Sequence, residues 1–529
     1  MRLSPISLAD AAKAETLVIP LFSKQSLGDE EIFSLLSKET GRSLLRLHKD
    51  EFTGEEGEAR MLWQIEGMPR RIILFGCGKR SEWRERKAHI LPRRIVQYLK
   101  QQGYGSAAVL IGPHFGPDME RAAALFAANA LLADFEFVRY KTFQKEERTK
   151  LSDIFPVVDR SAIKKFADGI RLGTVVAEET NLCRELANTP GSDMTPAKLA
   201  EEAVGVMRRV RGVRATTLDE AAMHKLGMGG ILGVARGSAE KPRLIILEYG
   251  GGRKGDRPLV LVGKGVTFDS GGINLKPANA LNEMHMDMSG GAAVIHGIAA
   301  IARLKIPVTA IGIVPAVENM PSGSSYRPGD VLRTMSGKTI EVLNTDAEGR
   351  VILSDALWYG ATKYNPGLMV DFATLTGAAM VALGTYCSAA FARESDPALM
   401  DKLVAVGAAS GDYVWPLPLW DEYLADIKGT FGDIANDHKT GGRYGGAIHG
   451  AKFLEQFTNN VRWAHIDIAP RMTANDADFL SKGATGAGVR FMVELARRYP
   501  EIQGGDKKLL KKSLRGAAAT KQSMQPLTV

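Results

Sequence analysis

Short apolar runs alternate with helix-like segments through most of the chain beyond residue 190, and this alternation constrains the fold more than any other feature. Strand-like runs rich in Val, Ile and Leu occupy 243–250, 258–265, 308–317, 368–377 and 462–469. The segments at 292–304 and 351–364 instead carry apolar residues at helical spacing. Strands that alternate with helices are joined by crossovers, which make the sheet mostly parallel and place helices on both faces. The sequence therefore predicts an α/β fold with a mixed, mostly parallel central sheet flanked by helices.

A chain of 529 residues is too long for one ordinary core, so more than one domain is expected. Residues 1–160 have the pattern of a smaller N-terminal α/β domain, with strand-like runs from Thr16, Arg71 and Ala107 and helix-like segments at 30–39 and 120–135. A connecting helix is predicted over 161–190, where the breaker NTPGSDMTP ends the pattern. The larger domain follows at 191–502, and a basic tail occupies 503–529.

Composition and charge exclude several classes of protein. Hydrophobic residues make up 45% of the chain and charged residues 24%, as in a folded globular protein. No apolar run is long enough to span a bilayer, and charged residues interrupt the N-terminal segment where a secretory signal would lie. The three cysteines, Cys77, Cys183 and Cys387, form no closely spaced pair, which suits a reducing compartment. We therefore expect a cytoplasmic protein with no membrane partner.

The net charge of +8 is concentrated at the C-terminal end of the chain. The tail after Gln503 carries six basic residues and one acid, which leaves about +3 for the rest. A basic tail is more often a solvated extension than a nucleic-acid arm. The charge alone therefore does not predict a nucleic-acid partner.

Charged residues follow two of the predicted strands, and these residues carry the candidate chemistry. The strand-like run from Pro258 leads into Lys264 and a Gly-rich turn with Asp269. A second strand, from Thr339, leads into Asp346 and Glu348 before the helix at 351–364, and Asp287 lies between the two segments. Open parallel sheets bind ligands beyond the carboxyl ends of their strands. Carboxylates gathered there would repel one another unless a cation supplied counter-charge. Two divalent cations at such a site can stabilise a hydrolytic transition state.

A purely structural explanation of the same residues stays open at this point. Asp346 and Glu348 could cap the helix that follows them. Lys264 could be an ordinary ion-pair partner. Spacing alone does not choose between these roles and a metal site.

Three segments resemble the leucine aminopeptidase family of two-metal exopeptidases: VGKGVTFDSGGINLKP at 262–277, MDMSGGAA at 286–293 and NTDAEGRVILSDAL at 344–357. The heptapeptide NTDAEGR is a specific signature of that family. The resemblance extends from about Asn181 to Tyr499. It implies a metal-dependent aminopeptidase that releases N-terminal residues from short peptides through a metal-bridged hydroxide.

By this resemblance, five residues hold two metal ions in each subunit. Asp269 and Glu348 would bridge both ions, Lys264 and Asp287 would complete the tighter site, and Asp346 would complete the more exchangeable one. A lysine ligand must bind as the neutral amine, so its pKa has to fall. The expected metal is Zn²⁺, with Mn²⁺, Mg²⁺ or Co²⁺ able to exchange, because oxygen ligands do not select sharply.

The resemblance also assigns catalytic roles to Lys276 and Arg350. Lys276, as an ammonium, would polarise the scissile carbonyl and stabilise the oxyanion. Arg350 would hold a bicarbonate ion that serves as general base, and a planar guanidinium suits a planar oxyanion. The structural alternative for each residue is a surface ion pair.

The side-chain pocket implied by the resemblance is lined by Met284, Thr374, Gly377, Ala469 and Met472. These residues are mostly apolar and uncharged, so Leu-like first residues should be preferred. His285 departs from several relatives, which carry lysine there, and this departure leaves the metal ligands unchanged.

Other functions have weaker support in the sequence. The chain has no HExxH motif, and Ser270 lies in DSGG rather than in a GxSxG elbow, which argues against a zincin and against a serine hydrolase. A DNA-binding or other additional role through the basic tail is the alternative, and an inactive relative is opposed by the presence of all seven key residues. The family assembles as a homohexamer, so the same assembly is expected here.

Overall fold

The computed structural model describes residues 1–23, 52–63, 70–142, 150–439 and 444–504. It contains two compact units: Met1–Glu178 with Asn475–Ser481, and Glu179–Ala474 with the described residues from Lys482 onward. The division falls inside helix α5 (Ile163–Asn188), which covers most of the predicted connecting helix. The helix expected at 30–39 and the tail beyond Gly504 lie outside the described residues.

The first unit is built on a sheet in which β1, β6, β5, β2, β4 and β3 follow one another. All neighbouring strands are parallel except β3, which runs antiparallel to β4. Its strands are β1 (Arg2–Leu3), β2 (Thr16–Leu21), β3 (Ala59–Trp63), β4 (Arg71–Gly76), β5 (Ser106–Leu110) and β6 (Asp153–Val157). Its longer helices, α3 (Glu85–Gln101) and α4 (Met119–Asp134), pack against each other. The apolar runs from Thr16, Arg71 and Ala107 are thus buried strands, as the sequence predicts.

The second unit contains the larger sheet, with the order β16-β15-β18-β14-β9-β11-β8-β7 and with β10 also paired to β11. Its central strands β18, β14, β9, β11 and β10 are parallel, whereas β15, β8 and β7 join through antiparallel pairs. The strands are β7 (Val213–Leu218), β8 (Arg243–Gly250), β9 (Leu259–Gly263), β10 (Gly265–Asp269), β11 (Thr309–Asn319), β14 (Leu368–Ala373), β15 (Ser388–Ala392), β16 (Val414–Pro416) and β18 (Trp463–Asp467). A small separate sheet consists of β12 (Val331–Arg333), β13 (Thr339–Glu341) and β17 (Ile434–Ala435).

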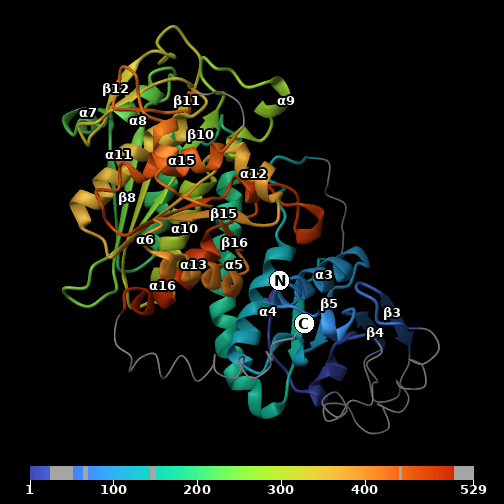
Figure 1. The fold of residues 1–529 in the computed structure, drawn as a ribbon. Helices are drawn as coiled ribbons and strands as arrows, with labels where there is room; N and C mark the ends of the chain where they lie inside the picture. Colours follow the sequence, from blue (N-terminus) through green and yellow to red (C-terminus); the bar gives the residue numbers. More distant parts are fainter. Residues whose placement is uncertain (24–51, 64–69, 143–149, 440–443, 505–529) are drawn as a thin grey trace, which may run out of the picture. The chain divides into compact units, whose positions relative to one another are not determined.

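Helices cover both faces of the larger sheet (Figure 1). On one face, α6 and α10 contact the central strands, and α16 packs between α10 and α13; α8, α11 and α15 contact strands from the other face. The helices of this unit are α6 (Pro196–Arg209), α7 (Glu220–Lys225), α8 (Gly229–Ala235), α9 (Ala278–Leu281), α10 (Ser289–Arg303), α11 (Glu348–Tyr364), α12 (Gly377–Leu383), α13 (Pro397–Ser410), α14 (Tyr423–Asp426), α15 (Gly446–Glu455) and α16 (Val489–Ile502). The predicted mixed, mostly parallel sheet flanked by helices is confirmed.

Short 3₁₀ helices connect several of these elements. They are η1 (Leu8–Lys13), η2 (Arg80–Glu82), η3 (Pro113–Phe115), η4 (Arg160–Ala162), η5 (Met284–Met286), η6 (Ala469–Arg471) and η7 (Asp476–Asp478). Within the described ranges, every helix is too short or too polar to cross a lipid bilayer.

Two glycines allow helix α10 to lie directly against the carboxyl ends of β9 and β14. A Cβ added to Gly290 would lie 2.1 Å from the carbonyl oxygen of Phe372, and one added to Gly263 would lie 2.3 Å from the carbonyl oxygen of Gly290. The backbone of Gly291 donates to the Lys264 carbonyl at 2.7 Å. This close approach brings the residues just before α10, including Asp287, beside the residues that follow β9.

Candidate metal centre

The charged residues singled out in the sequence come from three places at one edge of the larger sheet. Lys264 lies between β9 and β10, and Asp269 is the last residue of β10. Asp287 lies between η5 and α10, whereas Asp346 and Glu348 stand at the start of α11. Because β9, β10 and β11 are parallel, the residues that follow them reach the same edge.

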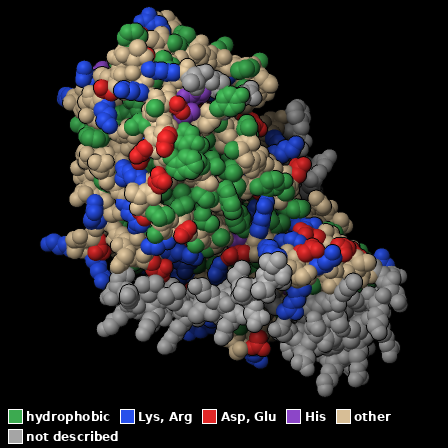
Figure 2. All heavy atoms as spheres, in the orientation of Figure 1, with side chains coloured by type: hydrophobic (Ala, Val, Ile, Leu, Met, Phe, Trp, Pro, Cys, Tyr) green, Lys and Arg blue, Asp and Glu red, His purple; other side chains and the backbone are tan. Residues whose placement is uncertain are grey.

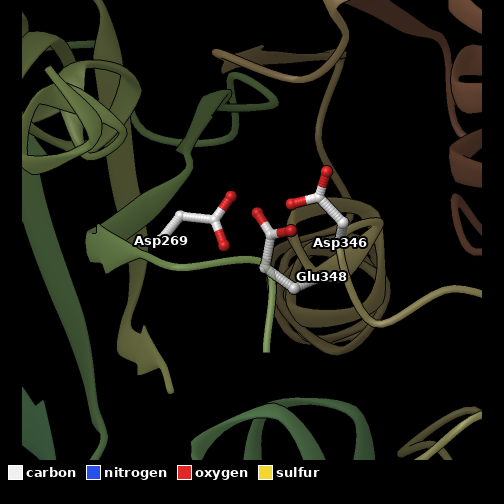
Figure 3. Close-up of side chains that lie close together, drawn as sticks. All are labelled: Asp269, Asp346 and Glu348. Atoms are coloured by element: carbon white, nitrogen blue, oxygen red, sulfur yellow. The ribbon is translucent and has the colours of Figure 1, made fainter. Parts of the chain in front are cut away.

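The side chains of three acids point toward one another. Asp269, Asp346 and Glu348 each offer a carboxylate oxygen, and these oxygens all lie within 4.8 Å of one another. Figure 3 shows Asp269 reaching from the end of its strand toward Asp346 and Glu348 at the start of α11. Asp269 and Glu348 are buried, and Asp346 is half-buried.

Two lysines join the acids into one cluster. Lys264 Nζ lies 2.8 Å from Asp287 Oδ2 and 2.7 Å from Glu348 Oε1. Lys276 Nζ lies 2.9 Å from Asp269 Oδ2 and 2.5 Å from Asp346 Oδ1. The structure therefore brings together all five predicted metal ligands and the predicted catalytic lysine.

Burial and crowding perturb the charges of the cluster. Burial, together with the nearby Asp269 and Glu348 carboxylates, raises the pKa of Asp346 to about 7. Burial and neighbouring carboxylates of the cluster also raise the pKa of Asp287 and of Glu348. Burial lowers the pKa of the Lys264 ammonium, but the surrounding carboxylates outweigh it and raise that pKa overall. The negative charge of the acids is thus only partly balanced, and the Lys264 ammonium supplies part of that balance.

The residues fit a pair of divalent cations. Oδ2 of Asp287, Oε1 of Glu348 and Oδ1 of Asp346 each face a lysine nitrogen at 2.5–2.8 Å, and the buried Oε2 of Glu348 has no hydrogen-bond partner. A buried carboxylate oxygen without a donor is costly unless a cation coordinates it. Oxygen-rich ligand sets of this kind suit Mg²⁺, Mn²⁺ and Zn²⁺. Binding of such cations would replace the Lys264 proton as counter-charge and allow its amine to act as a ligand.

The proposed helix-capping role of Asp346 and Glu348 is wrong. The N-cap of α11 is Ala347, so neither acid occupies the capping position, and the helix has no side-chain cap hydrogen bond there. Asp346 instead contacts Lys276, and Glu348 contacts Lys264. Both acids therefore face the cluster.

Arg350 lies buried in the first turn of α11. Its Nη1 donates to the Asn436 carbonyl at 2.9 Å, and its buried Nε has no hydrogen-bond partner. Burial lowers the pKa of the guanidinium, and Asp437 and Glu348 oppose that effect. Since Arg350 is only 6% exposed and Lys276 is paired with the cluster, a surface ion pair describes neither residue. A planar oxyanion fits the unpartnered donor of Arg350.

Of the predicted pocket residues, Thr374 contacts the cluster directly, and the others lie in or next to η5, α12 and η6. Thr374 is buried, and its hydroxyl donates to Asp287 Oδ1 at 2.6 Å. Met284 belongs to η5, which packs on β10. Gly377 begins α12, which contacts η6, where Ala469 lies, and Met472 directly follows η6. A Cβ at Gly377 would meet no atom within 4 Å, so open space lies beside that position.

Comparison with known protein families identifies the class of protein. The catalytic-domain profile of the cytosol aminopeptidase family matches residues 181–493, and its N-terminal-domain profile matches residues 18–144. The chain belongs to this family. The resemblance found in the sequence is thereby confirmed, and a cytosol aminopeptidase is a metal-dependent peptidase that acts on peptide substrates.

Individual members of the family resemble the chain over most of its length. The probable cytosol aminopeptidase of Chlorobaculum parvum (strain DSM 263 / NCIMB 8327) is 40% identical and is aligned over 92% of this chain and 97% of its own. The probable cytosol aminopeptidase of Geobacter sp. (strain M21) is 41% identical and is aligned over 85% of this chain and 90% of its own. Among solved structures, the bottromycin maturation enzyme BotP in complex with Mn matches with a TM-score of 0.78 and 29% identity, over 92% of this chain and 99% of that chain.

Several residues that support the cluster were not predicted from the sequence. The side-chain amide of Asn319 donates to Asp269 Oδ1 at 2.8 Å and to the Thr345 carbonyl at 2.9 Å, which joins the two acid-bearing segments. Asp467 accepts backbone hydrogen bonds next to Thr374. Both are the last residues of their strands, so the rule that selected Asp269 also applies to them.

Proposed function

We propose that the chain is a two-metal aminopeptidase that releases Leu-like N-terminal residues from short peptides. The observation that carries this proposal is the convergence of four carboxylates and two lysines in one cluster, in which the acids outnumber the lysines and Glu348 Oε2 has no hydrogen-bond partner. Membership of the cytosol aminopeptidase family supports the same activity.

Lys264, Asp269, Asp287, Asp346 and Glu348 would hold the two cations, with Asp269 and Glu348 shared between them. Zn²⁺ is the expected metal, and Mn²⁺, Mg²⁺ or Co²⁺ could replace it. When bound, the cations supply Lewis-acid activation of water and of the scissile carbonyl. The BotP structure is a complex with Mn, which supports the choice of manganese as a test metal.

Lys276 would stabilise the oxyanion that develops on the scissile carbonyl. Its ammonium lies 2.9 Å from Asp269 and 2.5 Å from Asp346, and the acids of the cluster raise its pKa although burial lowers it. It therefore stays protonated at neutral pH and can donate hydrogen bonds. One such donor is worth roughly 3 kcal/mol of transition-state stabilisation.

Arg350 would bind bicarbonate through its guanidinium, which is buried and has an unpartnered Nε. When bound, the bicarbonate supplies a general base. The contact with the Asn436 carbonyl fixes one edge of the guanidinium and leaves Nε available for a planar anion.

Recognition of a peptide's amino terminus would rest on the bound cations. A free α-amine can coordinate a metal ion in the site, whereas an internal peptide bond or a blocked terminus offers no such amine. Thr374, Gly377, Ala469, Met284 and Met472 would line the side-chain pocket with mostly apolar, uncharged surface. A Leu-like first side chain would bury apolar area there.

We also propose a homohexameric assembly in the cytoplasm. Hydrophobic side chains gather over the region of α12, β15 and β16 on the face shown in Figure 2. Val381 in α12, Tyr386 just before β15 and Trp415 in β16 are exposed. Large exposed apolar surfaces commonly bury themselves in subunit contacts, which supports an oligomer.

The proposed activity can be tested with leucyl-p-nitroanilide. Enzyme stripped with a chelator should lose activity, and Mn²⁺ or Zn²⁺ should restore it at neutral to alkaline pH. Succinyl-leucyl-p-nitroanilide, whose amine is blocked, is the matched control and should not be cleaved. Activity that survives exhaustive chelation would rule out the metal-dependent mechanism.

A further inference from the structure

Asp467 ends β18 and is fully buried. Its Oδ1 accepts from the backbone N–H groups of Leu375 and Ala469, each at 3.1 Å. Its Oδ2 accepts from Thr376, through the backbone N–H at 3.1 Å and the hydroxyl at 2.8 Å. A single carboxylate therefore fixes the turn after β14 and the start of η6.

The turn fixed by Asp467 contacts two of the proposed metal ligands through Thr374. The Thr374 carbonyl accepts a hydrogen bond from Lys264 Nζ at 2.9 Å. The Thr374 hydroxyl donates to Asp287 Oδ1 at 2.6 Å, and Oδ2 of the same aspartate lies 2.8 Å from Lys264 Nζ. Thr374 thus holds Asp287 by one oxygen while the other oxygen faces Lys264.

We propose that Asp467 is a positioning residue for Lys264 and Asp287, acting through the Thr374–Thr376 turn. This inference rests on the proposed function, because it concerns the ligands of the proposed cations. A lysine that coordinates a cation does so as the neutral amine, which keeps two N–H groups. The Thr374 carbonyl is placed to accept one of them, and Asp467 holds that carbonyl by binding the next two backbone N–H groups. Groups that orient metal ligands in this way commonly change metal affinity about 10–100-fold when they are removed.

Asp467→Asn is the direct test, because it keeps the shape of the side chain and places an amide NH₂ against N–H donors in either orientation. Asp355 offers a matched control on α11. It is also fully buried. It accepts hydrogen bonds from the backbone N–H of Ile231 in α8, at 3.0 Å, and of Met335 in the turn between β12 and β13, at 2.7 Å. Asp355→Asn therefore imposes a similar defect away from Lys264 and Asp287.

The measurement is calorimetric titration of Mn²⁺ into metal-free full-length protein at one pH. We expect two Mn²⁺ sites in the wild type and a loss of about 10–100-fold in the affinity of one site in Asp467→Asn. Asp355→Asn should keep both affinities within about twofold, since its contacts lie elsewhere. If Asp467→Asn binds Mn²⁺ with the same affinities as Asp355→Asn, the positioning role of Asp467 is overturned while the proposed function stands. A wild type that binds no Mn²⁺ overturns both.

A second pair of variants keeps the test valid if Asp467→Asn does not fold. Thr376→Val removes the hydroxyl that donates to Asp467 but keeps the shape of the side chain, whereas Thr376→Ser keeps the hydroxyl. We expect Thr376→Val to weaken Mn²⁺ binding several-fold and Thr376→Ser to stay within about twofold of the wild type. Equal Mn²⁺ affinities for the two variants would contradict the proposal.

Discussion

Six charged side chains share one buried site, and their charges do not balance. Asp269, Asp287, Asp346 and Glu348 carry four negative charges when ionised, and Lys264 and Lys276 carry two positive ones. The raised pKa of Asp346, about 7, expresses this imbalance, because burial and like charges disfavour its ionised form. Divalent cations would offset the repulsion among the carboxylates and coordinate their oxygens.

Exchange of Asp269 and of Lys276 for alanine should have different consequences. Asp269→Ala removes a proposed ligand of both cations and should lose metal as well as activity. Lys276→Ala should keep most of the metal but reduce kcat by about 10²–10³-fold, because it removes an oxyanion donor. Metal content by plasma mass spectrometry, together with kcat, separates the two. If Asp269→Ala retains both ions, the ligand assignment is wrong.

Asp355 should make the stability of the fold depend on pH. Burial raises the pKa of this carboxyl from 3.8 to about 7, against the hydrogen bonds from Met335 and Ile231 that lower it. Between these values the folded form keeps a proton that the unfolded form has lost, so stability falls as pH rises through this window. Relative to Asp355→Asn, the wild type should lose on the order of 2–4 kcal/mol between pH 4.5 and pH 8. Urea unfolding of both proteins measures the difference, and a pH-independent difference would contradict this origin.

Sequence patterns predicted the charged residues of the site but not the residues that hold them in place by hydrogen bonds. Asp269, Asp346 and Glu348 stand out because they follow or precede elements at the expected edge of the sheet. Asn319 and Asp467 also end strands, yet polar residues at strand ends are common, and only the fold shows that these two contact the cluster. Their role depends on contacts between segments far apart in the chain, which spacing does not encode.

At the scale of elements, apolar periodicity located the long strands and helices well. The helix predicted at 292–304 is α10, and the runs at 308–317 and 462–469 are β11 and β18. The short strand β10 and the antiparallel pairs of β15 and β8 were not predicted. Periodicity shows that a strand is buried, but the neighbour of a strand is decided by packing across the whole sheet.

Alanine substitutions at two helical glycines should change the stability of the fold in opposite directions. Gly290→Ala places a Cβ 2.1 Å from the Phe372 carbonyl oxygen, so α10 must shift and the fold should lose about 1–3 kcal/mol or more. Gly205→Ala in α6 meets no atom within 4 Å and should gain about 0.4–1 kcal/mol by stiffening the unfolded chain. Chemical unfolding of both variants provides the measurement. A neutral Gly290→Ala would show that the close approach of α10 is not needed.

At the scale of the whole molecule, sequence patterns predict that there are several domains but define their limits less well. The boundaries expected at 160, 190 and 502 remain predictions. The compact units divide within α5, and Asn475–Ser481 belongs to the first unit although it follows most of the second in the chain. No local pattern marks such a segment, because its assignment depends on contacts made hundreds of residues away.

The proposed function requires that the carboxylates and Lys264 bind two divalent cations in one site. Anomalous diffraction from crystals grown with Mn²⁺ tests it most directly, because the signal locates each manganese ion without reference to the activity. We predict two anomalous peaks in each chain, both in contact with Asp269 and Glu348, with Lys264 and Asp287 beside one peak and Asp346 beside the other. A map with no peak among these residues, or with manganese bound only elsewhere, would contradict the account.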